Sequence, residues 1–430
     1  MESTRCRVCG QGLVRLLFLS MTLPWPPNNG HRMRTWLLLR ALAAEGHQIT
    51  LLAFAYPADL GSDTGPLREV CTRLEVVPLE LASLAGWIGA LDRLRALMGS
   101  APYAVGRYRS PEMAGRIQSH LQGGRFDAVI VDTVFGTVNL PPTDAPLLLN
   151  NVDVEHVVLE RYVRCERNPV KRAYAWLEAR RLRRFEAEAC RRAAVGMPCS
   201  PADETQLRAL CPGLPLVVVP NVVDTAEYAP PRHDAGDVVL YQGGLDWYPN
   251  RDAVRFFASR ILPLIRRARP SVRFVVAGRN PPAAFRREVH AVPGLELTGP
   301  VPDMRPVLAR SSVCVVPLRI GSGTRIKILE AAAMARPVVS TTLGAEGLEF
   351  LDGEEIVLAD GPERFAQAVL GLLADHRRRR EVGSAARKRV EESYSPPVLR
   401  SQLRRVLGHV RGSRPREEPT AAAFAGQAAP

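Results

Sequence analysis

The sequence VCVVPLRIGSGTRIKILEAAAMARPVVSTTLGAEG, residues 313–347, decides the fold that we expect for this chain. Its first six residues are apolar and mostly β-branched, which predicts a buried parallel strand. Gly321 and Gly323 then lead into a helical pattern that Pro337 ends, and a second strand, PVVSTT, runs on towards Gly344. A strand, a glycine-rich loop, a helix and a further strand in this order form one unit of an α/β fold.

The glycine-rich loop is also a candidate anion site. The first turn of a helix leaves backbone N–H groups unpaired, with the positive end of the helix dipole behind them. Arg325 and Lys327 add two full positive charges in that turn, which indicates a ligand with several negative charges, such as a diphosphate. Each feature alone has a simpler explanation, because glycines before a helix often form only a tight turn and Glu330 could pair with either cation on a solvated face.

Length and charge limit the class of protein. A chain of 430 residues exceeds what one core usually supports, so we expect two domains. The net charge of +13 is carried by arginine, since Lys171, Lys327 and Lys388 are the only lysines. This charge suits an anionic substrate or an anionic membrane surface. Nucleic acid is not the expected partner, because the basic residues alternate with acids rather than with aromatic residues.

The N-terminal region contains no membrane-spanning pattern, because no apolar run reaches the ~20 residues that a spanning helix needs. Residues 13–20 precede PWPPNNG instead of a small-residue cleavage site, so they predict a strand rather than a secretory signal. Residues 1–12 are expected to be an extension, and Cys6 and Cys9 lack a second ligand pair for zinc. We therefore expect a cytoplasmic protein, either soluble or peripheral at the inner face of the membrane.

The first half of the chain opens with a βαβ pattern. Residues 14–20 predict a strand, residues 36–46 a helix, and the stretch from His47 a second strand. Gly30 is expected in the turn before that helix, where a ligand can approach the backbone. The loop lacks the G-x-G-x-x-G pattern, which disfavours a dinucleotide oxidoreductase. Further strands are expected at residues 74–79, 126–132 and 145–150.

Two helices of the first half each leave two interpretations open. Residues 81–98 form an amphipathic pattern, whose apolar stripe is a core face or, alternatively, a contact with a membrane or lipid acceptor. Residues 169–192 predict a long helix with arginines clustered at 180–184. Because Glu178, Glu186 and Glu188 lie among them, we expect a solvated face of paired charges. A basic patch against anionic lipid is the alternative.

A proline-rich polar segment at residues 227–236 is the expected linker between the domains. It separates an N-terminal domain, residues 13–226, from residues 237–395, where the alternation of strands and helices restarts. Residues 396–411 predict a C-terminal helix that could cross back to the first domain, and residues 412–430 an unstructured tail. The pattern predicts an α/β protein with two Rossmann-like domains facing a central cleft.

The second half resembles a known family. The stretches YQGGLDWYPNRDAV, FVVAGRNP, LTGPVPDMRP and VPLRIGSGTRIKILEAAAMARPVVSTTLGAEGL are similar, in order and spacing, to GT-B glycosyltransferases of the retaining family 4 type. Within that family the chain resembles the members associated with exopolysaccharide synthesis, over residues 13–395. PNVVD at 220–224 resembles the interdomain Pro-Asn-Gly-Val-Asp of the family, with Val222 in place of glycine.

The resemblance implies transfer of a sugar from a nucleotide-sugar donor to a hydroxyl group of a saccharide or lipid-linked acceptor, with retained configuration. Glu330 would bind the donor ribose, as the second carboxylate of a paired-glutamate motif. Arg279, Arg325 and Lys327 would face the diphosphate, and Gly30 would let the first domain approach it. The expected donor-binding set is completed by Gly244, Gly323 and Thr324.

Two departures from the family pattern affect the donor site. Ser322 stands where the first glutamate of the paired motif is usual, and DWYPN lacks the lysine that commonly follows the Gly-Gly loop. Arg279, Arg325 and Lys327 must therefore supply the positive charge. If they converge on the diphosphate together with the helix start, neither a metal nor another cofactor is required.

A general base or a sugar-orienting carboxylate is expected on the first domain. The candidates are Asp132, which ends one predicted strand, and Asp153 and Glu155, which follow the next. Helix capping or loop packing explains these carboxylates equally well. His31 and His156 are interpreted as structural. The rival functions are a nucleotide-sugar 2-epimerase, which needs no acceptor, and an inactive scaffold subunit, which Ser322 would suit.

Overall fold

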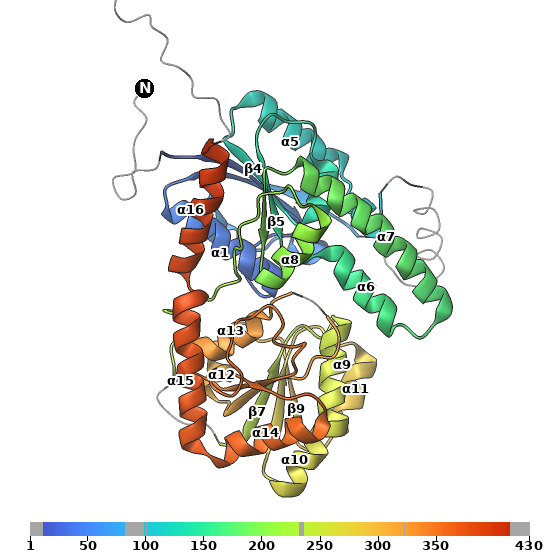
Figure 1. Cartoon of the computed structure of the whole chain (residues 1–430), viewed down its shortest axis with the longest axis vertical. Coiled ribbons are helices and arrows are strands. Elements are labelled where there is room, and N and C mark those ends of the chain that lie inside the picture. Colours follow the sequence, from blue (N-terminus) through green and yellow to red (C-terminus); the bar gives the residue numbers. More distant parts are fainter. Residues whose placement is uncertain (1–11, 82–98, 100, 232–235, 322, 413–430) are drawn as a thin grey trace, which may run out of the picture.

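The computed structural model describes residues 12–81, 99, 101–231, 236–321 and 323–412, which form two α/β domains stacked along the long axis of the molecule (Figure 1). Outside the described residues lie most of the expected N-terminal extension, most of the helix expected at 81–98, Ser322 and the tail after residue 412. Each domain contains one six-stranded sheet in which every pair of neighbouring strands is parallel.

The N-terminal sheet has the strand order β3-β2-β1-β4-β5-β6. Its first strand, RLLFLS, places Leu16 and Phe18 in one core cluster and Leu17 and Leu19 in another. Both faces of the strand are thus buried, which is why the run is apolar throughout. The elements are β1 (Arg15–Ser20), α1 (Gly30–Ala44), β2 (Gln48–Ala55), η1 (Pro57–Asp59), α2 (Gly65–Val70), β3 (Arg73–Pro78), α4 (Tyr103–Gly106), α5 (Pro111–Gly123), β4 (Ala128–Asp132), η2 (Val134–Asn139), β5 (Leu147–Asn151), α6 (Glu155–Cys165), α7 (Pro169–Arg192), β6 (Val195–Pro198) and α8 (Pro201–Leu210).

The C-terminal sheet has the order β12-β11-β10-β7-β8-β9, and a single core cluster joins it to its helices. The run VCVV forms β10 at the centre of the sheet, as the sequence predicts. The elements are β7 (Val238–Gln242), α9 (Tyr248–Phe256), η3 (Phe257–Ile261), α10 (Leu262–Ala268), β8 (Arg273–Ala277), α11 (Ala283–His290), β9 (Leu295–Gly299), α12 (Arg305–Ala309), β10 (Val313–Val316), α13 (Ile326–Ala333), β11 (Val338–Ser340), β12 (Val357–Leu358), α14 (Pro362–Ala374), α15 (His376–Ser393) and α16 (Pro396–Gly412).

Helix α1 begins six residues earlier than the apolar pattern predicts. The side chain of Asn29 accepts a hydrogen bond from the backbone nitrogen of Arg32 at 3.0 Å and thereby caps the helix. Gly30 is consequently the first residue of the helix, and not a residue of the preceding turn. The expectation of a turn glycine at this position was wrong, because the cap was not recognised in the run NNGHRMR.

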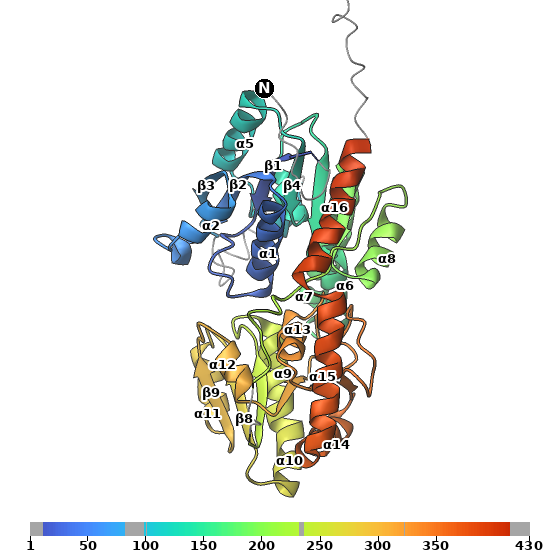
Figure 2. The same cartoon turned by 90° about the vertical axis from the view of Figure 1, so that its left-hand side faces the viewer.

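The C-terminal helices α15 and α16 run in succession along both domains (Figure 2). Helix α15 packs against α13, whereas α16 returns to the N-terminal domain and contacts α1 and β6. Leu399, Leu403 and Val406 belong to the core of that first domain. The end of the chain therefore joins the two domains. Within the described residues, no helix is both long and apolar enough to cross a lipid bilayer.

Candidate donor and acceptor site between the domains

Four loops carry the candidate site residues to the gap between the two domains. In each sheet the strand order reverses between two central strands, β1 and β4 in the first and β10 and β7 in the second. Loops leaving such strands diverge and open a crevice between them. Gly30 follows β1 and Asp132 ends β4, while Gly244 follows β7, and Gly321 and Gly323 follow β10. All four positions therefore lie at points where a ligand can enter.

Close contacts across the gap place the two sets of loops opposite each other. A methyl group added to Gly30 would lie 3.5 Å from Cδ1 of Ile326, the first residue of α13. A methyl group on Gly323, which has φ +76°, would lie 2.2 Å from Oδ1 of Asp153. The start of α13 thus faces the N-terminal domain, and the Asp153 carboxylate lies directly opposite the glycine loop. Only glycine fits at position 323 without displacing that carboxylate.

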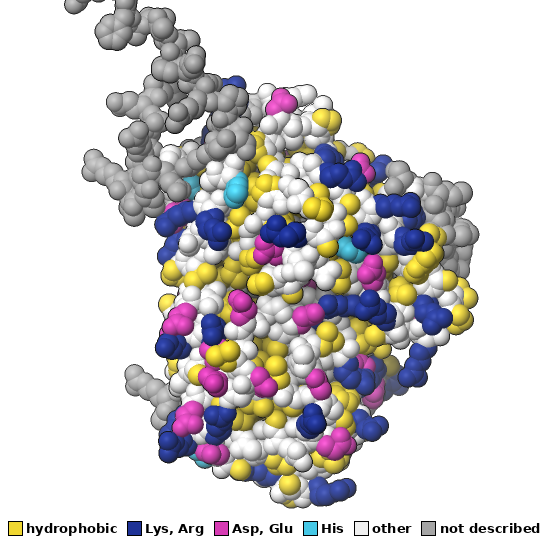
Figure 3. All heavy atoms as spheres, viewed as in Figure 1, with side chains coloured by type: hydrophobic (Ala, Val, Ile, Leu, Met, Phe, Trp, Pro, Cys, Tyr) yellow, Lys and Arg dark blue, Asp and Glu magenta, His cyan; other side chains and the backbone are white. Residues whose placement is uncertain are grey.

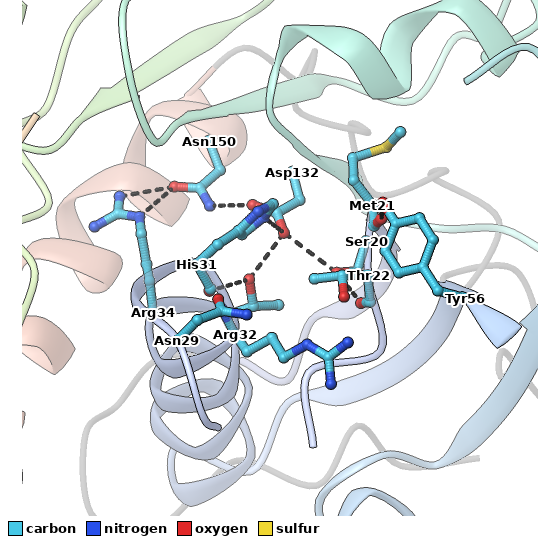
Figure 4. Close-up of polar contacts among 11 residues, drawn as sticks. Ser20, Met21, Thr22, Asn29, His31, Arg32, Arg34, Tyr56, Asp132 and Asn150 are labelled. Atoms are coloured by element: carbon cyan, nitrogen blue, oxygen red, sulfur yellow. Dashed lines mark hydrogen bonds and ion pairs between the residues drawn. The ribbon is translucent and has the colours of Figure 1, made fainter. Parts of the chain in front are cut away.

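Asp132 is fully buried and lies behind His31 (Figure 4). Its Oδ2 atom contacts His31 Nε2 at 2.7 Å and accepts hydrogen bonds from Thr35 Oγ1 at 2.8 Å and Ser20 Oγ at 3.2 Å. Its Oδ1 atom accepts one from Asn150 Nδ2 at 2.7 Å. With four partners and no exposure, Asp132 reaches a substrate only through the imidazole of His31, whose side chain is 29% exposed.

The charges of His31 and Asp132 stabilise each other. Burial lowers the pKa of His31, but the Asp132 carboxylate, the hydrogen bond to it and the nearby Asp153 outweigh this effect and raise the pKa above its ordinary value. Burial alone would raise the pKa of Asp132, yet His31 and the hydrogen bonds from Thr35 and Asn150 lower it. Each member of the pair therefore favours the charged form of the other. His31, which the sequence interpretation took as structural, is the member that faces the gap.

Asp153 and Glu155 lie at the start of α6 and differ in their surroundings. Asp153 is half-buried at the glycine loop and acts electrostatically on both His31 and Arg325. Burial, Asp153 and Glu186 together raise the pKa of Glu155 well above its ordinary value. Glu186 itself is buried and pairs with His156 Nδ1 at 2.6 Å. Asp153 is consequently the carboxylate of this group that both faces the glycine loop and acts electrostatically on the imidazole of His31.

Lys327 projects from α13 beneath the Gly-Gly loop of the second domain. Its Nζ donates to Tyr241 Oη and to Asn250 Oδ1, both at 3.1 Å, and lies 4.4 Å from the centre of the Tyr241 ring. A methyl group on Gly243 would meet this nitrogen at 2.7 Å. Burial, together with Arg325, lowers the pKa of Lys327 to about 7. The ammonium group is thus held by neutral groups in a site that favours the gain of an anion.

The two candidate arginines of the donor site have different positions. Arg325 turns under the glycine loop, where its Nη1 donates to the carbonyl oxygen of Gly323 at 2.6 Å. Arg279 lies beside Gly244 and reaches across the gap to Asn28 Oδ1 at 3.1 Å. Arg325 therefore shapes the loop from the N-cap position of α13. Arg279 bridges the two domains through its hydrogen bond to Asn28.

Glu330 lies about one turn after Lys327 on α13, and two side chains donate hydrogen bonds to its carboxylate. Its Oε1 accepts from Tyr228 Oη at 2.9 Å, and its Oε2 accepts from Gln242 Nε2 at 2.7 Å. Burial raises its pKa to about 7 despite these hydrogen bonds. Tyr228 belongs to the expected linker, so this segment is part of the candidate site and not merely a spacer. Neither Tyr228 nor Gln242 was found by sequence reasoning, although Gln242 directly ends β7.

A chain of buried polar contacts joins the His31–Asp132 pair to the donor loop. Asn150, which donates to Asp132, accepts from Arg34 Nη2 at 2.7 Å, and Arg34 Nη1 donates to Asn221 Oδ1 at 3.1 Å. Asn221 Nδ2 then donates to Thr324 Oγ1 at 2.5 Å. Asn221 belongs to the PNVVD segment, which was the available signal. The contacts of Arg34 with Asn150 and Asn221 span 116 and 187 positions and left no local pattern.

A second interdomain contact lies on the other side of the glycine loop. Arg161 of α6 forms a bidentate pair with Glu346, at 2.5 and 2.7 Å, and its Nη1 also donates to the carbonyl oxygen of Gly321 at 3.0 Å. A cavity of about 40 Å³ beside it is lined by Val154, Arg161, Asp203, Gly323 and Glu346. The domains are therefore in contact around a small, partly open space at the glycine loop.

Comparison with known proteins assigns the fold. Residues 236–375 match the model of the family Glycosyl transferases group 1. HepE of Anabaena, solved in complex with UDP and glucose, is 13% identical and superposes with a TM-score of 0.63 over 92% of this chain and 99% of its own. Sucrose-phosphate synthase of Thermosynechococcus elongatus is 17% identical, with a TM-score of 0.65 over 93% of this chain and 100% of its own. The fold is α/β of the GT-B type.

A relative found by sequence spans nearly the whole chain. It is an uncharacterized 44.6 kDa protein in the cps region of Klebsiella pneumoniae, 20% identical over 406 residues, which cover 91% of this chain and 99% of the relative. The match to the Glycosyl transferases group 1 model thus lies within the second domain, and the two-domain arrangement has the GT-B fold.

Proposed function

We propose that this chain is a glycosyltransferase that moves a sugar from a nucleotide-sugar donor to a hydroxyl group of a saccharide or lipid-linked acceptor, with retention, in the synthesis of an exopolysaccharide or another cell-surface glycan. One observation carries the proposal. The start of α13, with Arg325 at its N-cap and Lys327 in its first turn, faces Asp153 and the domain of His31 across a single gap. The presence of UDP in HepE and the cps-region location of the Klebsiella relative support it.

The second domain would bind the nucleoside diphosphate. Breaking the bond between the sugar C1 and the phosphate oxygen leaves negative charge on the departing diphosphate. The N–H groups at the start of α13, Lys327 and Arg279 are fixed before the reaction, so they stabilise that charge without reorganising. One well-placed donor of this kind is worth ~3 kcal/mol of transition-state energy. Glu330, on the inner side of α13, would accept hydrogen bonds from the ribose hydroxyls.

The first domain would hold the sugar and the acceptor. Retention requires the acceptor oxygen to bond to C1 on the face that the diphosphate leaves. An oxygen of the departing diphosphate is then next to the acceptor hydroxyl and takes its proton. His31, held by Asp132, would donate a hydrogen bond to the sugar from the opposite domain. Asp153 faces the glycine loop, where it would orient the acceptor, and closure of the domains would exclude water.

Nucleotide binding tests the donor site directly. We expect UDP, or another nucleoside diphosphate of a tested series, to raise the melting temperature, because a ligand at 100 times its Kd stabilises the folded state by about 2.7 kcal/mol. Lys327→Met should weaken that ligand about 10- to 100-fold, the value of a hydrogen bond to a charged group. Lys388→Met is the matched control, because Lys388 is 76% exposed on α15. Stabilisation unaffected by Lys327→Met would contradict the assignment.

The pH dependence of binding isolates the lysine further. Because the pKa of Lys327 is lowered to about 7, this amine must gain a proton before it can pair with a diphosphate at higher pH. The affinity difference between wild type and Lys327→Met should therefore shrink as pH rises above 7, by at most about tenfold per pH unit. Calorimetric titrations of both proteins measure this difference between pH 6 and 9, a range that includes the pKa of Lys327 at about 7. A constant difference would show that Lys327 does not meet the phosphate.

The reaction itself separates the transferase from a 2-epimerase. The protein incubated with the nucleotide sugar that binds, and with no acceptor, should leave the configuration of the sugar unchanged apart from slow hydrolysis. Product should form only when a membrane or saccharide extract is added as the source of acceptor. Appearance of the C2 epimer without acceptor would replace the proposed function.

A further inference from the structure

The outer face of the α6–α7 hairpin is basic and apolar at the same time. The sequence predicted a paired, solvated face here, but Glu178 and Glu186 point inwards. Glu178 is 4% exposed and bonds to the backbone nitrogen of Tyr103 and to Arg181, while Glu186 is 0% exposed and bonds to His156. The expected solvated face of paired charges was wrong for Glu178 and Glu186, which lie on the side of α7 that packs against the domain, whereas Glu188 near the end of α7 is exposed. The exposed side keeps the cations.

Seven exposed cations cover this outer face, and large apolar side chains lie among them. Val170 is 76% exposed, Trp176 50%, Leu177 39% and Tyr162 37%. Arg180 lies over the ring of Trp176 at 4.6 Å. In Figure 3, blue and yellow side chains alternate along the right-hand edge of the molecule, where Figure 1 places α6 and α7. The exposed cations are Arg164, Arg167, Lys171, Arg172, Arg180, Arg183 and Arg184.

Spacing along α7 places Arg172, Trp176 and Arg180 on one stripe. Positions 172, 176 and 180 are four residues apart and therefore lie one above another on the helix surface. Among the described residues 161–187, no acid is classed as exposed, and Glu188, nearer the C-terminal end of α7, is the exposed acid of this helix. Glu166, which is half-buried at the turn, accepts hydrogen bonds from Tyr162 Oη and from the backbone nitrogen of Asn168. The stripe therefore has a single sign of charge.

We propose that this face of the α6–α7 hairpin docks on an anionic lipid bilayer. Anionic headgroups attract clustered arginines and lysines near the membrane surface. A tryptophan, a valine and a leucine exposed on the same helix enter the region between headgroups and acyl chains, while long arginine side chains keep their charge in the headgroup layer. A soluble polyanion would use the charges but would leave Val170 and Leu177 in water. The bilayer accounts for both properties.

Docking by this hairpin also indicates the class of acceptor. That part of the inference rests on the proposed function. Helix α6 begins at Glu155, two residues after Asp153, and ends at Cys165 at the turn of the hairpin. Eleven helical residues span about 16 Å. A bilayer at the turn would consequently lie within reach of the gap between the domains for an acceptor sugar carried on a lipid diphosphate. A membrane-anchored acceptor is therefore the class that this geometry favours.

Vesicle flotation of the full-length protein tests the docking surface. We expect the wild type to float with phosphatidylcholine vesicles containing about one third phosphatidylglycerol, and not with pure phosphatidylcholine. Each cation at the surface contributes about fivefold to partitioning, so Arg172→Glu/Arg180→Glu should weaken binding by roughly 30-fold or more. Val170→Ser/Trp176→Ser should weaken it by roughly tenfold, because apolar area no longer leaves water.

A matched charge reversal far from the hairpin serves as control. Arg364 and Arg380 are exposed on α14 and α15 of the other domain, so Arg364→Glu/Arg380→Glu makes the same change in net charge and should keep vesicle binding. Melting curves with the bound nucleotide confirm that each variant folds and separate this inference from the donor site. Equal loss in the control, or absence of wild-type flotation, would overturn the proposal. Wild-type binding that tracks heparin and ignores Val170→Ser/Trp176→Ser would assign the surface to a soluble polyanion instead.

Discussion

His31 and Asp132 are 101 positions apart in the sequence and 2.7 Å apart in the structure. A solitary histidine after a strand has no sequence signal that separates a structural from a functional role. Here the distinction comes from exposure, because the carboxylate is fully buried and the imidazole is not. The residue that sequence reasoning selected, Asp132, therefore acts as the support of the residue that it set aside.

His31→Ala should lower stability most at acidic to neutral pH. Since the pKa of His31 is raised in the folded state, its stabilising contribution is complete below the ordinary value of 6.5 and declines as pH rises through the raised value. A hydrogen bond to a charged group contributes about 1.5–3 kcal/mol, so we expect a loss of this size near pH 6 that shrinks by pH 9. Thermal melts across this range measure it. His290→Gln, at an exposed position on α11, should follow the wild type, and a deficit independent of pH would contradict the role of the ion pair.

At the scale of elements, the position of α13 depends on helix α15. The side of α15 at Gly383 lies against the carbonyl oxygen of Ala335, just after α13 ends, and a methyl group there would come within 2.1 Å of that oxygen. Helix propensity alone favours alanine over glycine inside a helix by about 1 kcal/mol. The close backbone contact opposes this preference. Because α13 carries Lys327 and Glu330, the same contact fixes the position of these two side chains relative to the rest of the domain.

Gly383→Ala should therefore destabilise the protein although the helix itself gains propensity. Overpacking against a backbone carbonyl costs about 1–3 kcal/mol, more than the propensity returns. Gly371→Ala in α14 is the matched control, because nothing lies within 4 Å of the added methyl group. That substitution should stabilise the domain by up to about 1 kcal/mol. Urea unfolding of the two variants compares them, and similar midpoints would show that α15 has room to shift.

At the scale of the whole molecule, the two domains are held together by a few polar contacts around the gap and by α16. The Arg161–Glu346 pair joins α6 to the segment after β11, and Asn28 meets Arg279 on the other side of the glycine loop. Helix α16 anchors the end of the chain in the first domain through Leu399 and Leu403. Such an interface permits a change in the angle between the domains while α16 keeps them connected.

Removing the Arg161 contact should favour an open arrangement of the domains. Both side chains of the pair are about one third exposed, at 27% and 32%, so solvent screening limits its contribution to roughly 0.5–1 kcal/mol. That value shifts an open–closed equilibrium about two- to fivefold. Small-angle X-ray scattering should give a larger radius of gyration for Arg161→Ala and for Glu346→Ala, with no further increase in the double variant. Arg255→Ala, which breaks a pair within one domain, should leave the radius unchanged; additive effects of the interdomain variants would argue against a coupled contact.

The local sequence determined the elements and the cationic loop of the candidate donor site. Apolar β-branched runs such as VCVV and RLLFLS can only be buried strands, and Gly323, Arg325 and Lys327 lie within a few residues of one helix start, so their chemistry is local. Sequence spacing could therefore place them without knowledge of the rest of the chain.

The tertiary structure alone decided which side chains meet across long separations and which face of each helix is covered. It put His31 in front of Asp132, brought Tyr228 to Glu330 and turned Glu178 and Glu186 inwards, leaving Arg172, Arg180, Arg183 and Arg184 of α7 exposed. The physical reason is that a helix of mixed composition buries whichever face its neighbours can pack against and hydrogen-bond. That choice depends on elements many residues away, and no pattern within the helix records it.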